Sequence, residues 1–270
     1  MNDDLQFKLM IVGGGRLGSA LVSGLIESEW AKPKEVAIVE KDALRQVFLK
    51  DNFKGLFVSE SYVEASGAVI VVKPKDAKET LEAFVSQKTL PKRILSVMAG
   101  IRTEKLIQYS HGRVPILRAM PNTPALVLSA ASALAKGENA TDEDLEWGRQ
   151  ILLALGAVEI VDEEKLDAVT GLSGSGPAYI FYLAQAMIEA GIELGLDPQI
   201  SKNLVTQTFL GSATLMAQSK ESARELREMV TSPNGTTAKG IETLDQEGFY
   251  DAVKNAIKQA TSRSIEMSQE

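Results

Sequence analysis

Short runs of apolar residues alternate with helical stretches between Phe7 and Val161, and many of the runs are β-branched. Several runs are apolar at every position, which is typical of strands that are buried on both faces of a sheet. Alternation of this kind predicts an α/β fold built on a doubly wound, mostly parallel sheet. The predicted strands are Leu9–Val12, Val36–Val39, Ala68–Val72, Ile94–Met98, Ile116–Arg118, Ser132–Ala135 and Val158–Val161.

The pattern changes after Asp162, where no convincing strand follows. Long helical patterns are separated by turn residues, and Pro177 and Pro198 suit first-turn positions, where a missing N–H does little harm. We therefore predict two domains, residues 1–161 with the sheet and residues 162–270 with helices alone. The predicted helices of the second domain are Glu163–Leu172, Pro177–Leu194, Pro198–Ala217, Ala223–Val230 and Phe249–Met267.

The stretch from Pro177 to Leu194 is apolar nearly all round, which is typical of a helix buried on several sides. The helical domain is small for so much apolar surface. One interpretation is a compact bundle that stands alone. The interpretation that we favour is that two copies pack together through this domain, which gives a homodimer or a ring of dimers.

The composition narrows the class of protein. Of the 270 residues, 44% are hydrophobic and 24% are charged, as in a globular protein. The net charge of −7 and the lack of a long basic run argue against nucleic acid as a partner. No apolar run reaches the length needed to cross a membrane, and the N-terminus lacks the basic start of a signal peptide. We therefore expect a cytoplasmic protein with neither nucleic acid nor membrane as its partner.

The sequence holds no cysteine and one histidine, His111. Without cysteine there are no disulfides, thiolate nucleophiles or cysteine metal sites. His111 lies in Tyr109-Ser110-His111-Gly112-Arg113, which we expect to be an exposed loop after a helix. A Ser-His-Asp hydrolase or a multi-histidine site is then hard to build, and no metal is predicted.

A glycine pattern, G-x-G-x-x-G, follows the first predicted strand and opens a predicted helix, Leu17–Leu25. In this context the first glycine allows a tight turn, the second lets the backbone approach a pyrophosphate, and the third lets the helix pack on the strand. The helix N-terminus offers N–H groups and a partial positive charge to the phosphates. A turn without a ligand is the alternative, but this order of elements predicts a Rossmann-type dinucleotide site. Its predicted residues are Val12, Gly13, Gly14, Gly15, Arg16, Leu17 and Gly18.

Glu40 ends the second predicted strand, where a carboxylate accepts hydrogen bonds from the adenosine ribose of NADH and repels the 2′-phosphate of NADPH. Lys41 follows, and Arg45 lies one helical turn further on, so that either could reach a 2′-phosphate. A solvated strand end is the alternative for Glu40. The sequence favours NADH without excluding NADPH, and both Glu40 and Lys41 are predicted cofactor residues.

Lys73 and Pro74 follow the strand Ala68–Val72 at the edge of the sheet where the carboxyl ends of strands lie, and ligands bind at that edge. Lys73 is either a surface residue that closes the strand or a residue beside the nicotinamide. The predicted cofactor residues of this segment are Val71, Val72, Lys73 and Pro74.

Three further segments are more specific, namely Arg118–Pro124 (RAMPNTP), Thr170–Tyr179 (TGLSGSGPAY) and Val230–Thr237 (VTSPNGTT). With the glycine loop, the Val72-Lys73-Pro74 strand end and Ser96-Val97-Met98-Ala99-Gly100, they resemble the pyrroline-5-carboxylate reductase family. The resemblance runs from Phe7 to Met267 with the motifs in family order. It implies that Val97, Met98 and Ala99 also contact the cofactor.

The resemblance implies a Rossmann-type domain joined to a helical domain that interlocks with a second copy, with each active site drawing residues from both subunits. It implies hydride transfer from a nicotinamide to C5 of 1-pyrroline-5-carboxylate, which gives L-proline. It also implies that the catalytic hydroxyl of Thr237 hydrogen-bonds the ring nitrogen. The loop of Ser232, Thr236 and Thr237 then holds the substrate carboxylate, and Glu163 lines the substrate site. A protonated imine is already an electrophile, so a site without histidine, cysteine or metal suits this reaction.

The sequence departs from the family pattern at three places. Asn234 replaces the first glycine of Ser-Pro-Gly-Gly, and since asparagine tolerates positive φ, we expect the loop to keep its shape. Met229 stands where the family often has an asparagine near the cofactor. Glu40-Lys41 replaces the usual pair after the second strand, which leaves the cofactor preference open.

Two other functions fit parts of the sequence. A β-hydroxyacid dehydrogenase needs a lysine as proton acceptor where this chain has Ile180, which argues against that class. A regulatory protein that binds NAD(P) without turnover is the alternative from another class, and the change at Asn234 would suit it. Oxidation of NAD(P)H in the presence of the imine separates this alternative from an enzyme.

Overall fold

The computed structural model describes residues 7–86 and 90–269. The contacts within the chain divide it into two compact units. The first comprises Met1–Ser175 together with Gln259–Glu270, and the second comprises Gly176–Lys258. This division differs from the sequence-based boundary between residues 161 and 162, because residues 162–175 and the end of the last helix pack with the sheet unit.

In the described residues, an eight-stranded sheet runs through the first unit in the order β3-β2-β1-β4-β5-β6-β7-β8. All neighbouring strands are parallel except β6 and β7, which confirms the doubly wound, mostly parallel sheet. The order reverses at β1, between β2 and β4, and ligand clefts form at such a point. The strands are β1 (Phe7–Val12), β2 (Val36–Val39), β3 (Phe57–Ser59), β4 (Ala65–Ile70), β5 (Ile94–Ser96), β6 (Ile116–Met120), β7 (Ala130–Lys136) and β8 (Gly156–Ile160).

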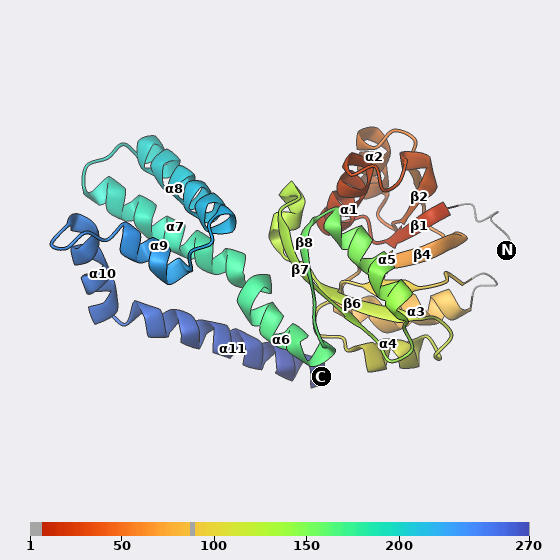
Figure 1. Cartoon of the computed structure of the whole chain (residues 1–270). Helices are drawn as coiled ribbons and strands as arrows, with labels where there is room; N and C mark the ends of the chain where they lie inside the picture. The colour runs from red at the N-terminus through yellow and green to blue at the C-terminus, as the bar shows by residue number, and fades with distance from the viewer. Residues whose placement is uncertain (1–6, 87–89, 270) are drawn as a thin grey trace. The chain divides into compact units, whose positions relative to one another are not determined.

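Each face of the sheet carries its own hydrophobic core, because successive side chains of a strand point to opposite faces. In β1, Leu9 and Ile11 pack into the core that α1, α2 and α5 complete, whereas Met10 and Val12 pack into the core beneath α3 and α4 (Figure 1). Burial on both faces accounts for the uninterrupted apolar runs. These helices are α1 (Arg16–Glu27), α2 (Ala43–Asn52), α3 (Ala77–Val85), α4 (Thr103–Tyr109) and α5 (Asp142–Leu153).

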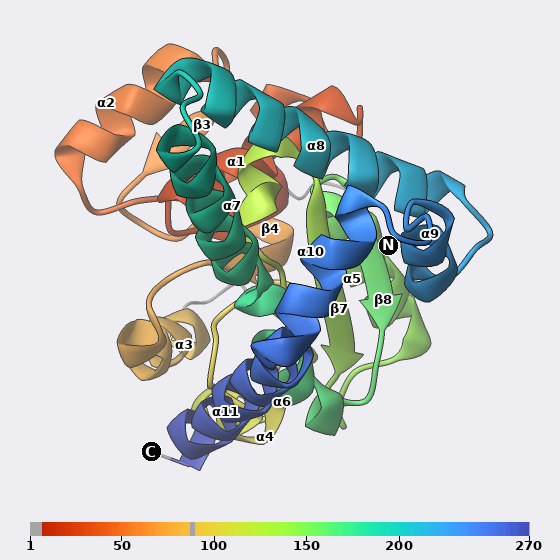
Figure 2. The same ribbon diagram turned by 90° about the vertical axis from the view of Figure 1, so that its left-hand side faces the viewer.

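The observed strands differ from the predicted ones mainly at their ends. β4 ends at Ile70 and β5 at Ser96, so Val71, Val72, Val97 and Met98 lie in the segments that follow these strands. β3 is an additional edge strand that, among residues 7–86 and 90–269, pairs only with β2. At the opposite edge, β7 and β8 run side by side (Figure 2). His111 is exposed after α4 with φ of 52°, as the loop prediction requires.

The predicted helix Glu163–Leu172 is a composite of three short pieces. A 3-10 turn at Glu163–Lys165 leads into α6 (Leu166–Val169), and a π-helical turn follows at Thr170–Gly174. A Cβ on Gly174 would lie 2.7 Å from Cε of Met120, so the turn packs closely on the end of β6. Single π turns of this kind are often found at functional sites.

The second unit is helical, as predicted, but it buries little of its apolar surface within one chain. Pro177 is the one buried residue of α7, while Phe181 is 66% exposed and Leu210 is 60% exposed. The helix α10 is additional to those predicted. In the described residues no helix is long and apolar enough to cross a membrane. The helices are α7 (Gly176–Glu193), α8 (Pro198–Gln218), α9 (Ala223–Met229), α10 (Thr236–Gln246) and α11 (Phe249–Gln269), of which α11 continues into the first unit.

Candidate active site

Two glycines of the G-x-G-x-x-G pattern, Gly13 in the loop after β1 and Gly18 in α1, stand where a side chain would clash with backbone. Gly13 has φ of 108°, and a Cβ there would lie 2.7 Å from the carbonyl oxygen of Val71. A Cβ on Gly18 would lie 2.1 Å from the carbonyl oxygen of Gly13. The fold itself therefore requires the first and third glycines of the pattern, for the turn and for the close contact between α1 and β1.

Gly15, the second glycine of the pattern, is different because the protein leaves space around it. A Cβ on Gly15 would meet no protein atom within 4 Å. Gly15 is the N-cap of α1, and no side chain caps that helix. The first-turn N–H groups have no partner within the helix, and they carry its partial positive charge. The space around Gly15 and the free N–H groups of the first turn of α1 together form a site that fits the diphosphate of a dinucleotide.

A cleft of about 510 Å³ lies at the carboxyl ends of β1, β2 and β4 and collects residues of several separate motifs. Tyr62 also lines it and was not predicted. Burial is the main cause that raises the pKa of the Tyr62 phenol, so this side chain remains a neutral hydrogen-bonding group. The predicted cofactor residues that line the cleft are Val12, Gly13, Gly15, Glu40, Lys41, Val71, Val72 and Lys73.

The other predicted cofactor residues lie around this cleft or beneath it. Arg16 and Leu17 line a separate hollow of about 230 Å³ together with Asn122. Met98 is buried, and the N–H of Val97 donates to the carbonyl of Ile70 at 3.1 Å. The remaining predicted residues, Gly14, Gly18, Pro74 and Ala99, do not line either hollow.

Glu40 holds the glycine loop in place through a hydrogen bond to its backbone. Its Oε2 accepts a 2.8 Å hydrogen bond from the N–H of Gly14, and its Oε1 accepts a 2.8 Å hydrogen bond from the N–H of Asp42. Both carboxylate oxygens are thereby held in place at the end of β2. Lys41 points to the other wall of the cleft, where its Nζ lies 3.2 Å from Oε1 of Glu79, and this pairing raises the pKa of Lys41.

Asn122, in the RAMPNTP segment, holds two distant parts of the first unit together. Its Nδ2 donates to the carbonyl of Ser173 at 3.1 Å, and its Oδ1 accepts from the N–H of Ala131 at 3.0 Å. The segment after β6 is thereby joined to β7 and to the π-helical turn. The sequence marked this segment as specific but gave no role to the asparagine, because its partners are far away in the chain.

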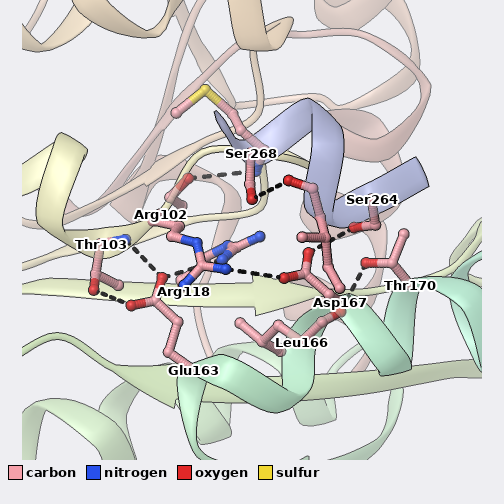
Figure 3. A network of polar contacts seen from close by, with 12 residues as sticks. Arg102, Thr103, Arg118, Glu163, Leu166, Asp167, Thr170, Ser264 and Ser268 are labelled. Atoms are coloured by element: carbon pink, nitrogen blue, oxygen red, sulfur yellow. Dashed lines mark hydrogen bonds and ion pairs between the residues drawn. The ribbon is translucent and has the colours of Figure 1, made fainter. Parts of the chain in front are cut away.

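Glu163 lies in a network of polar contacts within the first unit (Figure 3). Its Oε1 accepts from the N–H of Thr103 at 2.6 Å and from Nη1 of Arg118 at 3.1 Å, and its Oε2 accepts from the Thr103 hydroxyl. Arg118 is 3% exposed and Glu163 is partly exposed, so the arginine end of this ion pair is buried. Glu163 is thus bonded to β6 through Oε1 and to the start of α4 through both carboxylate oxygens.

Asp167 is a second carboxylate of the same network. Its Oδ2 lies 3.3 Å from Nη2 of Arg102, and its Oδ1 accepts a 2.7 Å hydrogen bond from the hydroxyl of Ser264 (Figure 3). The end of α11 therefore lies against α6 in both ribbon views (Figures 1 and 2). The sequence singled out neither residue, since nothing in the local pattern links positions so far apart.

The third specific segment precedes and begins α10 in the second unit. Asn234 has φ of 58°, so asparagine does adopt the left-handed conformation that the replaced glycine would favour. The N–H of Gly235 donates to the carbonyl of Ser232 at 3.0 Å, which closes the turn. Thr236 and Thr237 form the first turn of α10, and both are exposed. In the described part of the chain the Thr237 hydroxyl makes no hydrogen bond, so it is available to a ligand.

Comparison with protein families finds separate matches for two parts of the chain. Residues 163–267 match the family described as pyrroline-5-carboxylate reductase dimerisation. Residues 8–100 match the family described as NADP oxidoreductase, coenzyme F420-dependent. The first match covers the exposed helices, and the second covers all the residues that line the cleft.

Individual relatives are similar over nearly the whole chain. Pyrroline-5-carboxylate reductase 1 of Bacillus subtilis is 33% identical over 98% of this chain and 91% of its own length. The Arabidopsis thaliana pyrroline-5-carboxylate reductase is 36% identical over 98% of this chain and 96% of its own. The structure of a pyrroline-5-carboxylate reductase from Coxiella burnetii superposes with a TM-score of 0.90 at 29% identity, covering 97% and 99% of the two chains. A Plasmodium falciparum pyrroline carboxylate reductase with NADP bound gives a TM-score of 0.82 at 28% identity, covering 97% and 98%.

Proposed function

The chain belongs to the pyrroline-5-carboxylate reductase family, and from this we propose that it reduces 1-pyrroline-5-carboxylate to L-proline with hydride from NADH or NADPH. The observation that carries the proposal is that the similarity includes both the unit with the cleft and the unit with the VTSPNGTT segment. The reaction is the last step of proline biosynthesis.

The cleft fits the dinucleotide by the chemistry of its residues. The open backbone at Gly15 and the first turn of α1 supply donors for the diphosphate, and Glu40 supplies acceptors for ribose hydroxyls. When bound, the reduced nicotinamide supplies the hydride. Lys73 and the segments after β4 and β5 lie at the same edge of the sheet, and we assign them to the nicotinamide half of the cofactor.

The substrate half of the site is assigned to the loop before α10. The N–H groups at the start of a helix and the hydroxyls of Ser232 and Thr236 suit a carboxylate. The Thr237 hydroxyl is placed on the ring nitrogen. As hydride reaches C5 of the protonated imine, the C=N π electrons become a nitrogen lone pair. That nitrogen, now an amine, can accept a hydrogen bond from the Thr237 hydroxyl, which the protonated imine cannot. The contact therefore stabilises the transition state more than the bound substrate.

Glu163 was predicted to line the substrate site, and this remains a prediction. Its contacts with Thr103 and Arg118 favour another role, since both carboxylate oxygens already have protein partners. We propose that Glu163 holds the turn before α6 against β6 and the start of α4, and that it affects the substrate only through that arrangement.

The assembly that we propose is a homodimer through residues 163–267, the region that matches the dimerisation family. The exposed apolar side chains of α7 and α8 are the surface that a second copy would cover. A ring of dimers, like the cytoplasmic location, stays a prediction.

The test is the oxidation of NADH and of NADPH, followed at 340 nm, with synthetic 1-pyrroline-5-carboxylate and with product proline measured by chromatography. 1-Pyrroline, which lacks the carboxylate, is the matched control substrate. We expect turnover of the first compound and a kcat/KM at least a hundredfold lower for the second. Binding of dinucleotide without any oxidation would instead support the regulatory alternative.

A further inference from the structure

The end of the cleft beyond β2 combines a fixed carboxylate with further acidic residues. Glu40 receives backbone N–H groups on both oxygens, each at 2.8 Å. Glu60, Asp76 and Glu79 line the same cleft. Gln46 adds a further link, because its Nε2 donates to the carbonyl of Glu40 at 2.8 Å and lies 3.2 Å from Oε1 of Glu60. For Glu40 to turn away from a ligand, two short hydrogen bonds to the backbone would have to break.

Arg45, the strongest candidate for a phosphate ligand, is engaged elsewhere. Its guanidinium donates to the carbonyl of Gly14, to the carbonyl of Gly15 at 3.0 Å and to the hydroxyl of Ser19 at 2.5 Å. It also stacks on Phe48, with Cζ 4.2 Å from the ring centroid. The Arg45 side chain thus hydrogen-bonds two carbonyl groups of the glycine loop, while Glu40 accepts from the N–H of Gly14 in the same loop.

Lys41 is held only by a surface ion pair. Its side chain is 80% exposed and that of its partner Glu79 is 76% exposed, and pairs of this kind contribute little. Lys41 could therefore leave Glu79 for another anion. It follows Glu40 directly in the chain, so a 2′-phosphate could recruit it without disturbing the glycine loop. Lys73 and Lys75 are the other lysines that line the cleft.

We propose that the enzyme is selective for NADH, that Glu40 excludes the 2′-phosphate, and that Arg45 braces the glycine loop instead of binding phosphate. A carboxylate has about four acceptor positions, so Glu40 retains capacity for ribose hydroxyls beside its two backbone donors. A 2′-phosphate offers no donor to Glu40 and brings a charge of about −2 next to it. The inference rests on the proposed function in one respect, namely that the cleft of the first unit binds the nicotinamide dinucleotide.

Equilibrium binding is the primary test, measured by isothermal titration with NADH and NADPH and with two fragments, ADP and adenosine 2′,5′-bisphosphate. We expect NADH to bind at least tenfold more tightly than NADPH. Glu40→Gln keeps the size of the side chain and removes its charge, and it should lower the NADH to NADPH ratio by at least fivefold. Asp76→Asn removes a charge from the same cleft without touching the glycine loop or the ion-pair partner of Lys41, and it should change the ratio by less than threefold.

Arg45→Ala separates a brace from a phosphate ligand. As a brace, Arg45 should affect both dinucleotides by the same factor, whereas a phosphate ligand would affect NADPH alone. A double variant, Glu40→Ser with Lys41→Arg, adds a bidentate phosphate donor and should bind NADPH more tightly than NADH. Melting temperatures of all variants show whether each one is folded.

Wild-type protein that binds NADPH as tightly as NADH would overturn the inference, as would an unchanged ratio in folded Glu40→Gln. Loss of NADPH binding alone in Arg45→Ala would overturn the role of Arg45. These outcomes are independent of the proposed reaction. Selective binding of NADH without imine reduction would refute the reaction and leave the inference standing, while reduction that is faster with NADPH would do the reverse.

Discussion

The Ser264 hydroxyl donates a 2.7 Å hydrogen bond to the carboxylate of Asp167, which lies 97 residues earlier in the chain. Both side chains are buried, and Arg102 contacts the other Asp167 oxygen at 3.3 Å. Three stretches of the first unit meet at this carboxylate: the segment before α4, the helix α6 and the end of α11. The Asp167 carboxylate is therefore one of the contacts that hold the end of α11 on the first unit.

Ser264→Ala should lower the free energy of unfolding by about 1–2 kcal/mol, because a buried carboxylate oxygen loses its donor. Ser268→Ala is the matched control on the same helix, since the Ser268 hydroxyl donates only to the nearby carbonyl of Ile265. It should stay within about 0.5 kcal/mol of wild type. Urea unfolding followed by circular dichroism measures both. Equal stability of the two variants would mean that the contact with Asp167 contributes nothing.

Glu163→Gln should reduce stability by about 3 kcal/mol, because the buried Arg118 guanidinium loses its counter-charge. The KM for the imine should rise less than threefold if Glu163 acts only through this pair. Glu164→Gln, at the exposed neighbouring residue, is the control and should change neither quantity. A large rise in KM with normal stability would instead place Glu163 on the substrate.

Gly15→Ala should leave the melting temperature unchanged, because its Cβ meets no protein atom. The same change should weaken dinucleotide binding by at least tenfold, since the methyl group occupies the space of the diphosphate. Gly18→Ala should instead affect the melting temperature more than dinucleotide binding. Its Cβ clashes with backbone, which costs about 1–3 kcal/mol and lowers the melting temperature by several degrees. Unaltered affinity in Gly15→Ala would place the diphosphate elsewhere.

Thr237→Ala should lower kcat as well as kcat/KM by roughly ten- to a thousandfold, or about 1.4–4 kcal/mol, because the lost hydrogen bond strengthens during the reaction. Dinucleotide affinity should change little, because Thr237 lies outside the cleft of the first unit. Thr236→Ala should be milder, since its backbone N–H survives, and Thr237→Ser should restore most of the rate. Near-normal kcat in Thr237→Ala, in steady-state assays, contradicts the assignment.

Phe181→Asp should shift the protein from dimer to monomer in sedimentation velocity, because it places a charge on an apolar surface that is 66% exposed in one chain. Leu44→Asp is the matched control, as Leu44 is an exposed apolar residue of α2 in the first unit. A wild-type protein that is monomeric and active at nanomolar concentration would refute the dimer.

The sequence was sufficient to predict those strands and helices whose residues share the same degree of burial or begin at a clear turn signal. Continuous apolar runs such as Val36–Val39 identify strands buried on both faces, and the turn prolines locate α7 and α8. The three residues of β3 are a half-exposed edge, so they carry no such signal. The helix α10 was missed because no residue in it is buried within one chain and because a turn precedes it directly.

In the candidate site, too, only the features that depend on residues adjacent in the sequence could be predicted. The glycine pattern and Glu40 could be predicted because strand, turn and helix are adjacent in the sequence. The support of that loop by Arg45 could not, since it depends on which rotamer the guanidinium adopts against Gly15 and Ser19. Likewise the π-helical turn at Thr170–Gly174 departs from the 3.6-residue period on which helix prediction rests.

Residues 259–269, at the end of α11, pack with the first unit, and this affects the order in which the protein can fold while it is being synthesised. Protein chains emerge from the ribosome at about 5–20 residues per second, and N-terminal domains usually fold while the rest is still being made. Here the sheet can form early, but the contact of Asp167 with α11 can form only after Ser264 has emerged from the ribosome. Until then α6 stays uncovered, so the first unit is completed after the helical unit that follows most of it in the sequence.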